Sequence, residues 1–187
     1  MKTTRPGVLR RDAAVVARIV RAGGIVGYPV EACFGLGCDP RNTAAVRRLL
    51  RMKRRPAAKG LIVLACDAKA LRPYAADLPP QARASWPGPH TWLVEANPML
   101  SASVRGHHRE VAVRVTAHRQ AARLARLCGG ALISTSANRA RERPARTHRE
   151  LCRRMGRGLD AVLVGRIGRL ARPTPIRDAR SGRLVRA

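Results

Sequence analysis

The chain has 187 residues, of which 45% are hydrophobic, and its 38 Lys and Arg against 11 Asp and Glu give a formal net charge of +27. This apolar content excludes a disordered basic tail, and no run of about 18 uninterrupted apolar residues, the length that a membrane-spanning helix needs, occurs in the sequence. We therefore expect a soluble, basic, globular protein that is attracted to polyanions such as nucleotides or nucleic acid.

The first half of the chain predicts two helices that alternate with strands. In chain order, the expected elements are a helix from the cap Asp12 to Gly23-Gly24, a strand over 25–28, a loop punctuated by Gly35 and Gly37, a second helix capped by Thr43, and a buried strand over 61–65.

The second half continues the alternation. Its expected elements are a turn over 86–91, strands over 92–95 and 111–115, a helix over 120–128, a strand over 131–133, a helix to Met155 that begins with a Thr147–Glu150 capping box, a strand over 161–164, and a final hairpin of 175–178 and 183–186 around Ser181-Gly182. This order favours one α/β domain, over residues 8–187, with a mixed parallel and antiparallel sheet.

The composition by itself identifies no partner. Four of the cationic residues are lysines, which leaves 38 − 4 = 34 arginines. With so many arginines, a general bias of composition explains the presence of any single Arg as well as a functional role would. Aromatic residues, at 3%, are too few for a platform that stacks single-stranded bases. The five cysteines have no zinc-binding spacing, which favours reduced thiols in a cytoplasmic protein. Arg18 interrupts the apolar residues near the N-terminus, so we expect no targeting segment.

The first segment that could carry chemistry is 28–39, in which a strand leads into the loop with Gly35 and Gly37. Glycines there would let backbone N–H groups approach an anion. An ordinary tight turn with a solvated Glu31 is the alternative.

The second segment places Lys53, Arg55 and Lys59 between a helix and a buried strand. Lys and Arg in such a position suit phosphate groups, because Lys supplies a point charge and Arg a bidentate fork. The alternative is a helix C-terminus whose cations oppose the helix dipole.

The third segment is 131–138, an apolar strand that ends in Ser134, Ser136 and Asn138. Ligands of α/β proteins gather beyond the carboxyl ends of strands, although a capped turn would use the same residue types. Arg114 lies among apolar residues of another strand, so it either faces solvent or needs an anion. No arrangement of His with Ser, Cys or Asp suggests covalent catalysis.

Taken in order, five motifs resemble the YrdC/TsaC family of threonylcarbamoyl-AMP synthases. They are Tyr-Pro-x-Glu-Ala-x-Phe-Gly-x-Gly-Cys-Asp-Pro at 28–40, Lys-x-Arg-Pro at 53–56, Trp-Pro-Gly-Pro-x-Thr at 86–91, Ala-Val-Arg-Val at 112–115 and Ser-Thr-Ser-Ala-Asn at 134–138. The resemblance runs from about Val8 to the C-terminus. It implies a three-layer α/β fold with a twisted mixed sheet around a basic cavity.

The resemblance also implies the reaction and its partners. L-threonine, bicarbonate and ATP, with Mg²⁺ expected, would give threonylcarbamoyl-AMP and pyrophosphate. A carbamate formed on the amine of threonine would attack the α-phosphate of ATP. The product would then pass to a transferase complex that modifies tRNA, with direct tRNA binding as a further expectation.

Site residues follow from the same resemblance, without a protein-held metal. Lys53 and Arg55 would be catalytic as parts of a triphosphate clamp. The expected ATP-binding residues are Lys53, Arg55, Lys59, Ser136, Asn138 and Arg186. The expected threonine-binding residues are Val30, Arg114, Ser134 and Thr174.

Three positions depart from the family pattern. Val30 stands where the family usually has Thr, Arg139-Ala140 replaces a Ser-Gly that usually follows the Asn, and His90 replaces a small or apolar residue. Val30 and the altered loop motivate one alternative, an RNA-binding relative that has lost or altered synthase activity. A second alternative is an enzyme with another acceptor amino acid, which Val30→Thr would test.

Overall fold

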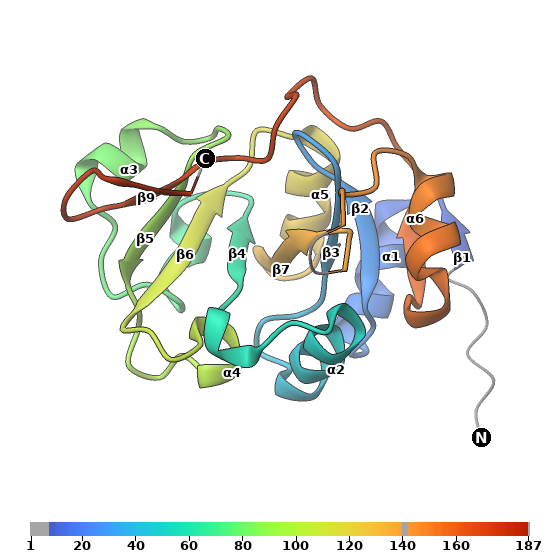
Figure 1. Ribbon diagram of the computed structural model, residues 1–187, viewed down its shortest axis with the longest axis horizontal. Helices are drawn as coiled ribbons and strands as arrows, with labels where there is room; N and C mark the ends of the chain where they lie inside the picture. The colour runs from blue at the N-terminus through green and yellow to red at the C-terminus, as the bar shows by residue number, and fades with distance from the viewer. Residues whose placement is uncertain (1–7, 140–141, 187) are drawn as a thin grey trace.

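The computed structural model describes residues 8–139 and 142–186. Within these residues, one ten-stranded sheet has the order β1-β8-β2-β3-β7-β4-β6-β5-β9-β10 (Figure 1). The strands are β1 (Val8–Arg10), β2 (Val26–Pro29), β3 (Phe34–Gly37), β4 (Ile62–Ala65), β5 (Thr91–Glu95), β6 (Glu110–Val115), β7 (Ala131–Ser136), β8 (Ala161–Leu163), β9 (Ile176–Asp178) and β10 (Leu184–Arg186).

The α-helices are α1 (Ala13–Arg21), α2 (Thr43–Lys53), α3 (Pro80–Ala84), α4 (Ala102–Arg105), α5 (Arg119–Leu127) and α6 (His148–Met155). Three short 3₁₀ helices span Ala57–Lys59, Lys69–Leu71 and Gly156–Gly158. Within 8–139 and 142–186, no helix has the length and apolar content that a bilayer span requires.

The sheet is mixed, as the sequence predicts. The pairs β1–β8, β2–β8, β4–β6 and β5–β9 are parallel, and the pairs β2–β3, β3–β7, β4–β7, β5–β6 and β9–β10 are antiparallel. The predicted hairpin at the C-terminus is confirmed as β9–β10, and because β9 also pairs with β5, the hairpin extends the main sheet.

Strand alternation divides the core into two clusters, one on each face of the sheet. In β7, Leu132 packs into a cluster with apolar residues of α1 and α5, whereas its neighbour Ile133 packs into a cluster with α2 and α6. Helices therefore cover both faces, and the three layers expected from the family resemblance are confirmed.

Helices begin where a side chain can accept a hydrogen bond from the free backbone N–H groups of the first turn. Asp12 caps α1 as predicted, by accepting from the Ala14 N–H at 2.8 Å. The prediction for α2 was wrong by one residue, because Asn42 rather than Thr43 accepts from the Ala45 N–H. Thr147 caps α6 as expected, but the Glu150 carboxylate bonds to the backbone N–H of the residue before the cap rather than to that of Thr147.

The predicted glycine loop was wrong, because Gly35 and Gly37 lie within β3. This strand pairs with β2 on one side and β7 on the other. A Cβ at Gly37 would lie 2.4 Å from the carbonyl oxygen of Ile133 and 2.8 Å from the ring of Tyr28. Gly37 therefore serves close packing between strands, not a loop around an anion. Glu31, between β2 and β3, is buried, so the solvated alternative was also wrong.

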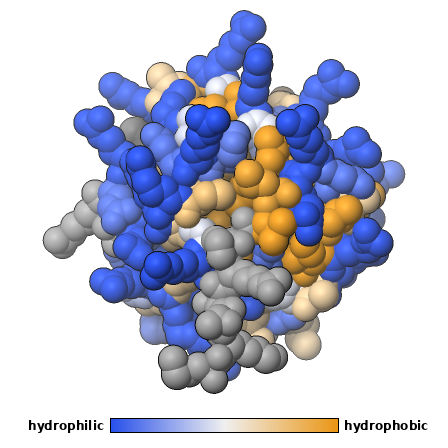
Figure 2. All heavy atoms as spheres, turned by 90° about the vertical axis from the view of Figure 1, so that its right-hand side faces the viewer, coloured by the Kyte–Doolittle hydropathy of each residue, from blue (hydrophilic) through white to orange (hydrophobic). Residues whose placement is uncertain are grey.

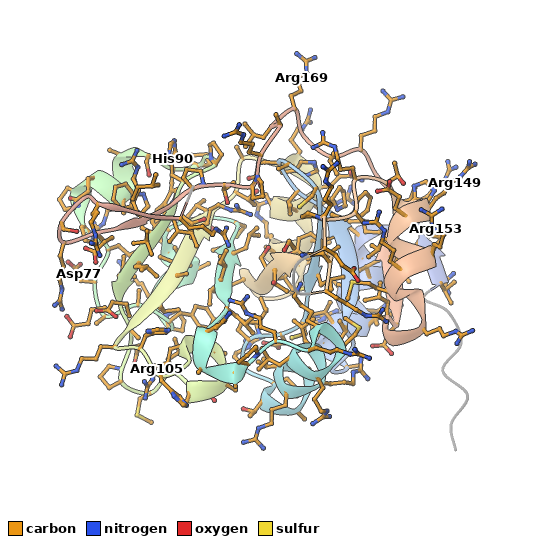
Figure 3. All side chains as sticks on the ribbon, in the orientation of Figure 1. Asp77, His90, Arg105, Arg149, Arg153 and Arg169 are labelled. Carbon is orange, nitrogen blue, oxygen red and sulfur yellow. The ribbon has the colours of Figure 1, made fainter. Side chains whose placement is uncertain are left out.

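Most arginines are on the surface. Arg149 and Arg153 on α6, and Arg169 in the loop that leads to β9, are exposed and point away from the molecule (Figure 3). The side that carries α6 and β1 is largely hydrophilic, with apolar surface showing between the polar side chains (Figure 2). β1, at the edge of the sheet, leaves Val8 and Leu9 exposed.

Candidate active site

A cavity of about 460 Å³ lies on one face of the sheet, beyond the part that α1 and α5 cover. Alternate residues of β6, namely Glu110, Ala112 and Arg114, line it, while the residues between them pack into the core on the opposite face. The other lining residues are Val30, Glu31, Ala32, Cys33, Gly35, Arg55, Lys59, Gly60, Leu61, Ile62, Leu93, Arg105, His108, Ser134, Thr135, Ser136, Asn138, Pro144, Pro173, Thr174, Ile176, Val185 and Arg186.

The cavity brings together nine of the ten site residues expected from the sequence. They are Val30, Arg55, Lys59, Arg114, Ser134, Ser136, Asn138, Thr174 and Arg186. Two strand-pairing features explain this convergence. Through β4, Arg114 is level with Leu132 and Ala112 is level with Ser134, so Arg114 lies one same-face position from the polar end of β7. The pair β5–β9 brings the C-terminal residues to the same cavity.

Arg114 is 4% exposed and is held by groups from distant parts of the chain. Its Nη2 lies 3.4 Å from Oε2 of Glu31, and its Nη1 donates to Oγ1 of Thr174. The other carboxylate oxygen of Glu31 accepts from Oγ1 of Thr116 at 2.5 Å. Thr174 also lies 3.4 Å from Thr91, hydroxyl to hydroxyl. The anion that the sequence requires for a buried Arg114 is therefore Glu31, which sequence reasoning missed.

Asn138 forms a tight turn at the carboxyl end of β7. Its Oδ1 accepts from the Ser136 hydroxyl, and its Nδ2 donates to the carbonyls of Arg139 and Glu142, both at 2.9 Å. Ser136 and Asn138 thus keep a fixed conformation beside the cavity. Of the departure at 139–140, Arg139 takes part in this turn and Ala140 lies outside the described residues.

Lys53 is buried and does not line the cavity. Its ammonium donates to the backbone carbonyl of Ser136 and, at 2.7 Å, to that of Asn138. Burial, with a smaller contribution from Arg55, lowers the pKa of Lys53 to about 8. The ammonium therefore stabilises the turn at 136–138 without lining the cavity.

Besides Arg114, the cationic side chains that line the cavity are Arg55 and Lys59, Arg105 of α4, and Arg186 of β10. Arg55 is fixed by the carbonyl of Gly60, which accepts from its Nη2 at 2.9 Å and from its Nε at 3.2 Å. Arg186 donates to the carbonyl of Thr174 at 3.3 Å. Partial burial lowers the pKa of Arg55, and that of Arg186 is lowered by partial burial and by the neighbouring charges of Arg55 and Arg114. An anion between these cations would relieve their mutual repulsion.

Sequence reasoning missed further lining residues, among them Arg105 of α4 and Glu110 of β6. Arg105 carried no usable signal among 34 arginines, and only the alternation of β6 with Arg114 could have placed Glu110 on the same face. Val30 is 6% exposed and lines the cavity, so that departure touches the site. His90 does not, because it precedes β5 outside the lining, where its carbonyl accepts from the Trp86 indole (Figure 3).

The chain is similar to proteins of a known family. Residues 18–187 match the family model Sua5/YciO/YrdC, whose description reads "Telomere recombination". The Threonylcarbamoyl-AMP synthase of Halorhodospira halophila is 50% identical over 187 residues, covering 98% of this chain and 96% of the relative. That of Stenotrophomonas maltophilia is 48% identical over 185 residues, covering 96% and 98%.

Among solved structures, the P. abyssi Sua5 complexed with L-threonine superposes with a TM-score of 0.84 at 25% identity, over 92% of this chain and 53% of that chain. This chain therefore spans about half the length of that Sua5. E. coli YciO has a TM-score of 0.81 at 21% identity over 96% and 92%, which supports the fold alone. The chain belongs to the Sua5/YciO/YrdC family.

Proposed function

We propose that this protein is a threonylcarbamoyl-AMP synthase, which forms threonylcarbamoyl-AMP and pyrophosphate from L-threonine, bicarbonate and ATP. Relatives about 50% identical over nearly the whole chain carry that name. The observation that carries the proposal is one cavity lined by a polar strand end, several cations and a buried arginine. The alternative of an RNA-binding relative without synthesis has less support, because of the departures that motivate it Val30 still lines the cavity and the turn at Asn138 is still formed.

The chemistry requires no protein nucleophile. A carbamate oxygen, formed on the amine of threonine, attacks the α-phosphorus, and the bond to the bridging oxygen of pyrophosphate breaks. We propose that Arg55, Lys59 and Arg186 bind the triphosphate and stabilise the charge that gathers on the leaving pyrophosphate. Ser136 and Asn138 would hold the nucleotide.

The role that we propose for Lys53 differs from the catalytic role that its motif predicts. Because its ammonium is taken by the carbonyls of Ser136 and Asn138, we propose that it acts on the nucleotide by holding that turn in place. It is then a positioning residue, and Arg55 contacts the phosphates directly.

We propose that the amino-acid end of the cavity is the part around Arg114. Its guanidinium would bind the threonine carboxylate, and the hydroxyls of Ser134 and Thr174 would contact the rest of the amino acid. Val30 would line the same pocket through its methyl groups. Val30 has a methyl group where Thr would have a hydroxyl, so it should affect chiefly the affinity for threonine.

Mg²⁺ enters the proposal with ATP, as the MgATP substrate. Within the residues that the structure describes, no group of three or more His, Cys, Asp or Glu could hold a metal ion. The cavity carboxylates are Glu31, which is engaged by Arg114 and Thr116, and Glu110. Phosphate oxygens are the usual Mg²⁺ ligands in such sites, so we propose that the nucleotide carries the ion.

The proposal extends to the domain boundaries and the partners of the protein. We propose that residues 8–187 form one domain, which is supported by the continuous sheet from β1 to β10. We propose that the product passes to a transferase complex that modifies tRNA. Surface arginines such as those on α6 would favour tRNA contact through its phosphates.

Pyrophosphate release tests the function. With the purified protein and MgATP, we expect release that requires threonine and bicarbonate together, and mass spectrometry should detect threonylcarbamoyl-AMP. Release at the same rate without threonine contradicts the proposal. Tight, salt-sensitive tRNA binding without any turnover favours the RNA-binding alternative instead.

A further inference from the structure

Two buried polar atoms beside the cavity have no hydrogen-bond partner among the described residues. They are Oε2 of Glu31 and Nε of Arg114. Glu31 is 7% exposed and Arg114 4%, and both line the cavity. Buried polar groups in native proteins are nearly always satisfied, so an unsatisfied acceptor and an unsatisfied donor on neighbouring side chains indicate a ligand.

The two atoms match the two ends of an α-amino acid. Nε of Arg114 can donate to a carboxylate, and Oε2 of Glu31 can accept from an ammonium group. Since Oε2 lies 3.4 Å from Nη2 of the same guanidinium, one molecule with adjacent ammonium and carboxylate groups can reach both. The proposed function already uses Arg114 for the carboxylate, and it leaves the partner of the amine unassigned.

The Glu31 carboxylate is fixed in a way that keeps Oε2 available. Its Oε1 accepts from Oγ1 of Thr116 at 2.5 Å, and that hydroxyl oxygen accepts from the backbone N–H of His118 at 3.1 Å. The Glu31 carbonyl accepts from the N–H of Leu170 at 3.2 Å. The backbone carbonyl and Oε1 thus have donors in the protein, whereas Oε2 has the ion pair with Arg114 and no hydrogen bond, so it can still accept from a ligand.

Glu31 also borders a second, more open hollow on its other side. This hollow is lined by Glu31, Pro89, Ala117, His118, Arg119, Gln120, Gly165, Arg166, Gly168, Arg169 and Leu170. Of the described residues, Glu31 alone belongs to both linings. The contacts of Glu31 with Gly168 and Leu170 of this second lining are made by its backbone, which fixes the position from which its side chain enters the first cavity.

We infer that Glu31 is the base that removes a proton from the amino group of the acceptor amino acid, so that the amine can form its carbamate. This inference rests on the proposed function. Threonine binds with its ammonium on Oε2, and Glu31 accepts one proton. The amine nitrogen then bonds to the carbon of bicarbonate and hydroxide leaves, which with the second amine proton gives water. In sum, carboxylate, ammonium and bicarbonate become carboxylic acid, carbamate and water.

The surroundings of Glu31 determine how a pH profile is interpreted. Arg114 and Cys33 line the first cavity with it, and the buried Tyr28 lies close enough to feel its charge. The charged and titratable residues of the second lining are His118, Arg119, Arg166 and Arg169. Burial raises the pKa values of Tyr28 and Cys33, so both stay neutral below pH ~9. Lys53, whose pKa is about 8, changes charge in the parent and in a Glu31 variant alike, so only a difference between the two profiles is assigned to Glu31.

The test is the pH dependence of kcat/KM for threonine in Glu31→Gln, measured by pyrophosphate release. At neutral pH we expect a loss of about 100-fold or more, the usual contribution of a general base. The loss should shrink about tenfold per pH unit on the alkaline side, because free threonine then supplies its own unprotonated amine. A Glu31→Gln profile parallel to that of the parent would overturn the inference.

Controls separate this result from folding and from the proposed function. Glu110→Gln removes another cavity carboxylate, and His118→Asn removes the imidazole of the second lining while keeping a capping side chain. Neither should change the shape of the profile. Thr116→Val keeps the carboxylate but removes its donor, so the acid limb should move to higher pH; an unmoved limb would contradict the assignment even if Glu31→Gln fails to fold. A parent without threonine-dependent release refutes the proposed function itself.

Discussion

Replacing Gly37 by Ala tests whether the glycines of β3 serve packing or anion binding. The added Cβ would meet the Ile133 carbonyl oxygen at 2.4 Å and the Tyr28 ring at 2.8 Å. Gly35, two residues earlier on the same strand, is the matched control, because its added Cβ would have its nearest neighbours at 3.5 and 3.6 Å, which is ordinary contact.

The magnitude follows from these distances. To reach the 3.4 Å at which ordinary contact begins, the Ile133 carbonyl must retreat by about 1.0 Å, and it belongs to the backbone of β7. Overpacking of this kind costs about 1–3 kcal/mol, and a Gly to Ala change returns roughly 0.4–1 kcal/mol through the unfolded chain. Because a backbone carbonyl must move, we take the upper end of the overpacking range, which leaves a net loss of about 2 kcal/mol, or a Tm lower by about 4–8 °C for a chain of this size.

Thermal and urea unfolding of the parent, Gly37→Ala and Gly35→Ala measure this directly. We expect the free energy of unfolding of Gly35→Ala to lie within about 1 kcal/mol of that of the parent. The substitution lowers the entropy of the unfolded chain as Gly37→Ala does, but it creates no clash. Gly35 lines the cavity, so its variant should affect ligand affinity more than stability. Equal stability of Gly37→Ala and the parent, together with weaker ATP binding, would refute the packing argument and restore the anion loop.

Three further predictions concern the cavity. Arg114→Lys should raise the KM for threonine by about 10–100-fold and leave ATP binding unchanged, because one ammonium cannot replace a charged fork; an unchanged KM removes Arg114 from the amino-acid site. Val30→Thr should increase the preference for threonine over valine by about 2–10-fold through one hydrogen bond, which competition between the two amino acids measures, and an unaltered preference contradicts the placement of Val30. Since burial lowers the pKa of Lys53 from its usual 10.5 to about 8, the unfolded chain binds more protons between these values, so the free energy of unfolding of the parent should rise over pH 8–10.5 relative to that of Lys53→Met, by about 3 kcal/mol. Urea unfolding at several pH values checks this, and parallel curves contradict it.

Local signals predicted much of the fold. Apolar runs with turn residues at their ends correctly indicated β4, β7 and the final hairpin. Caps were correct where one side chain alone could accept, as at Asp12, and were misplaced where Asn42 and Thr43 competed for the same helix. The glycines of β3 were misinterpreted because glycine is equally suited to a loop and to a strand against which a neighbouring ring packs.

The sequence by itself determined which residue types are available to the cavity, because the motifs supply the strand-end hydroxyls, the cations near 53–59 and the strand arginine. Only the tertiary structure decided which of them meet. Strand order, which sequence periodicity does not encode, places Glu31 against Arg114, carries Thr174 and Arg186 over the sheet through β9 and β10, and directs Lys53 onto backbone carbonyls. Periodicity reports the face on which a side chain lies, whereas its electrostatic partner depends on which strands become neighbours when the core is buried.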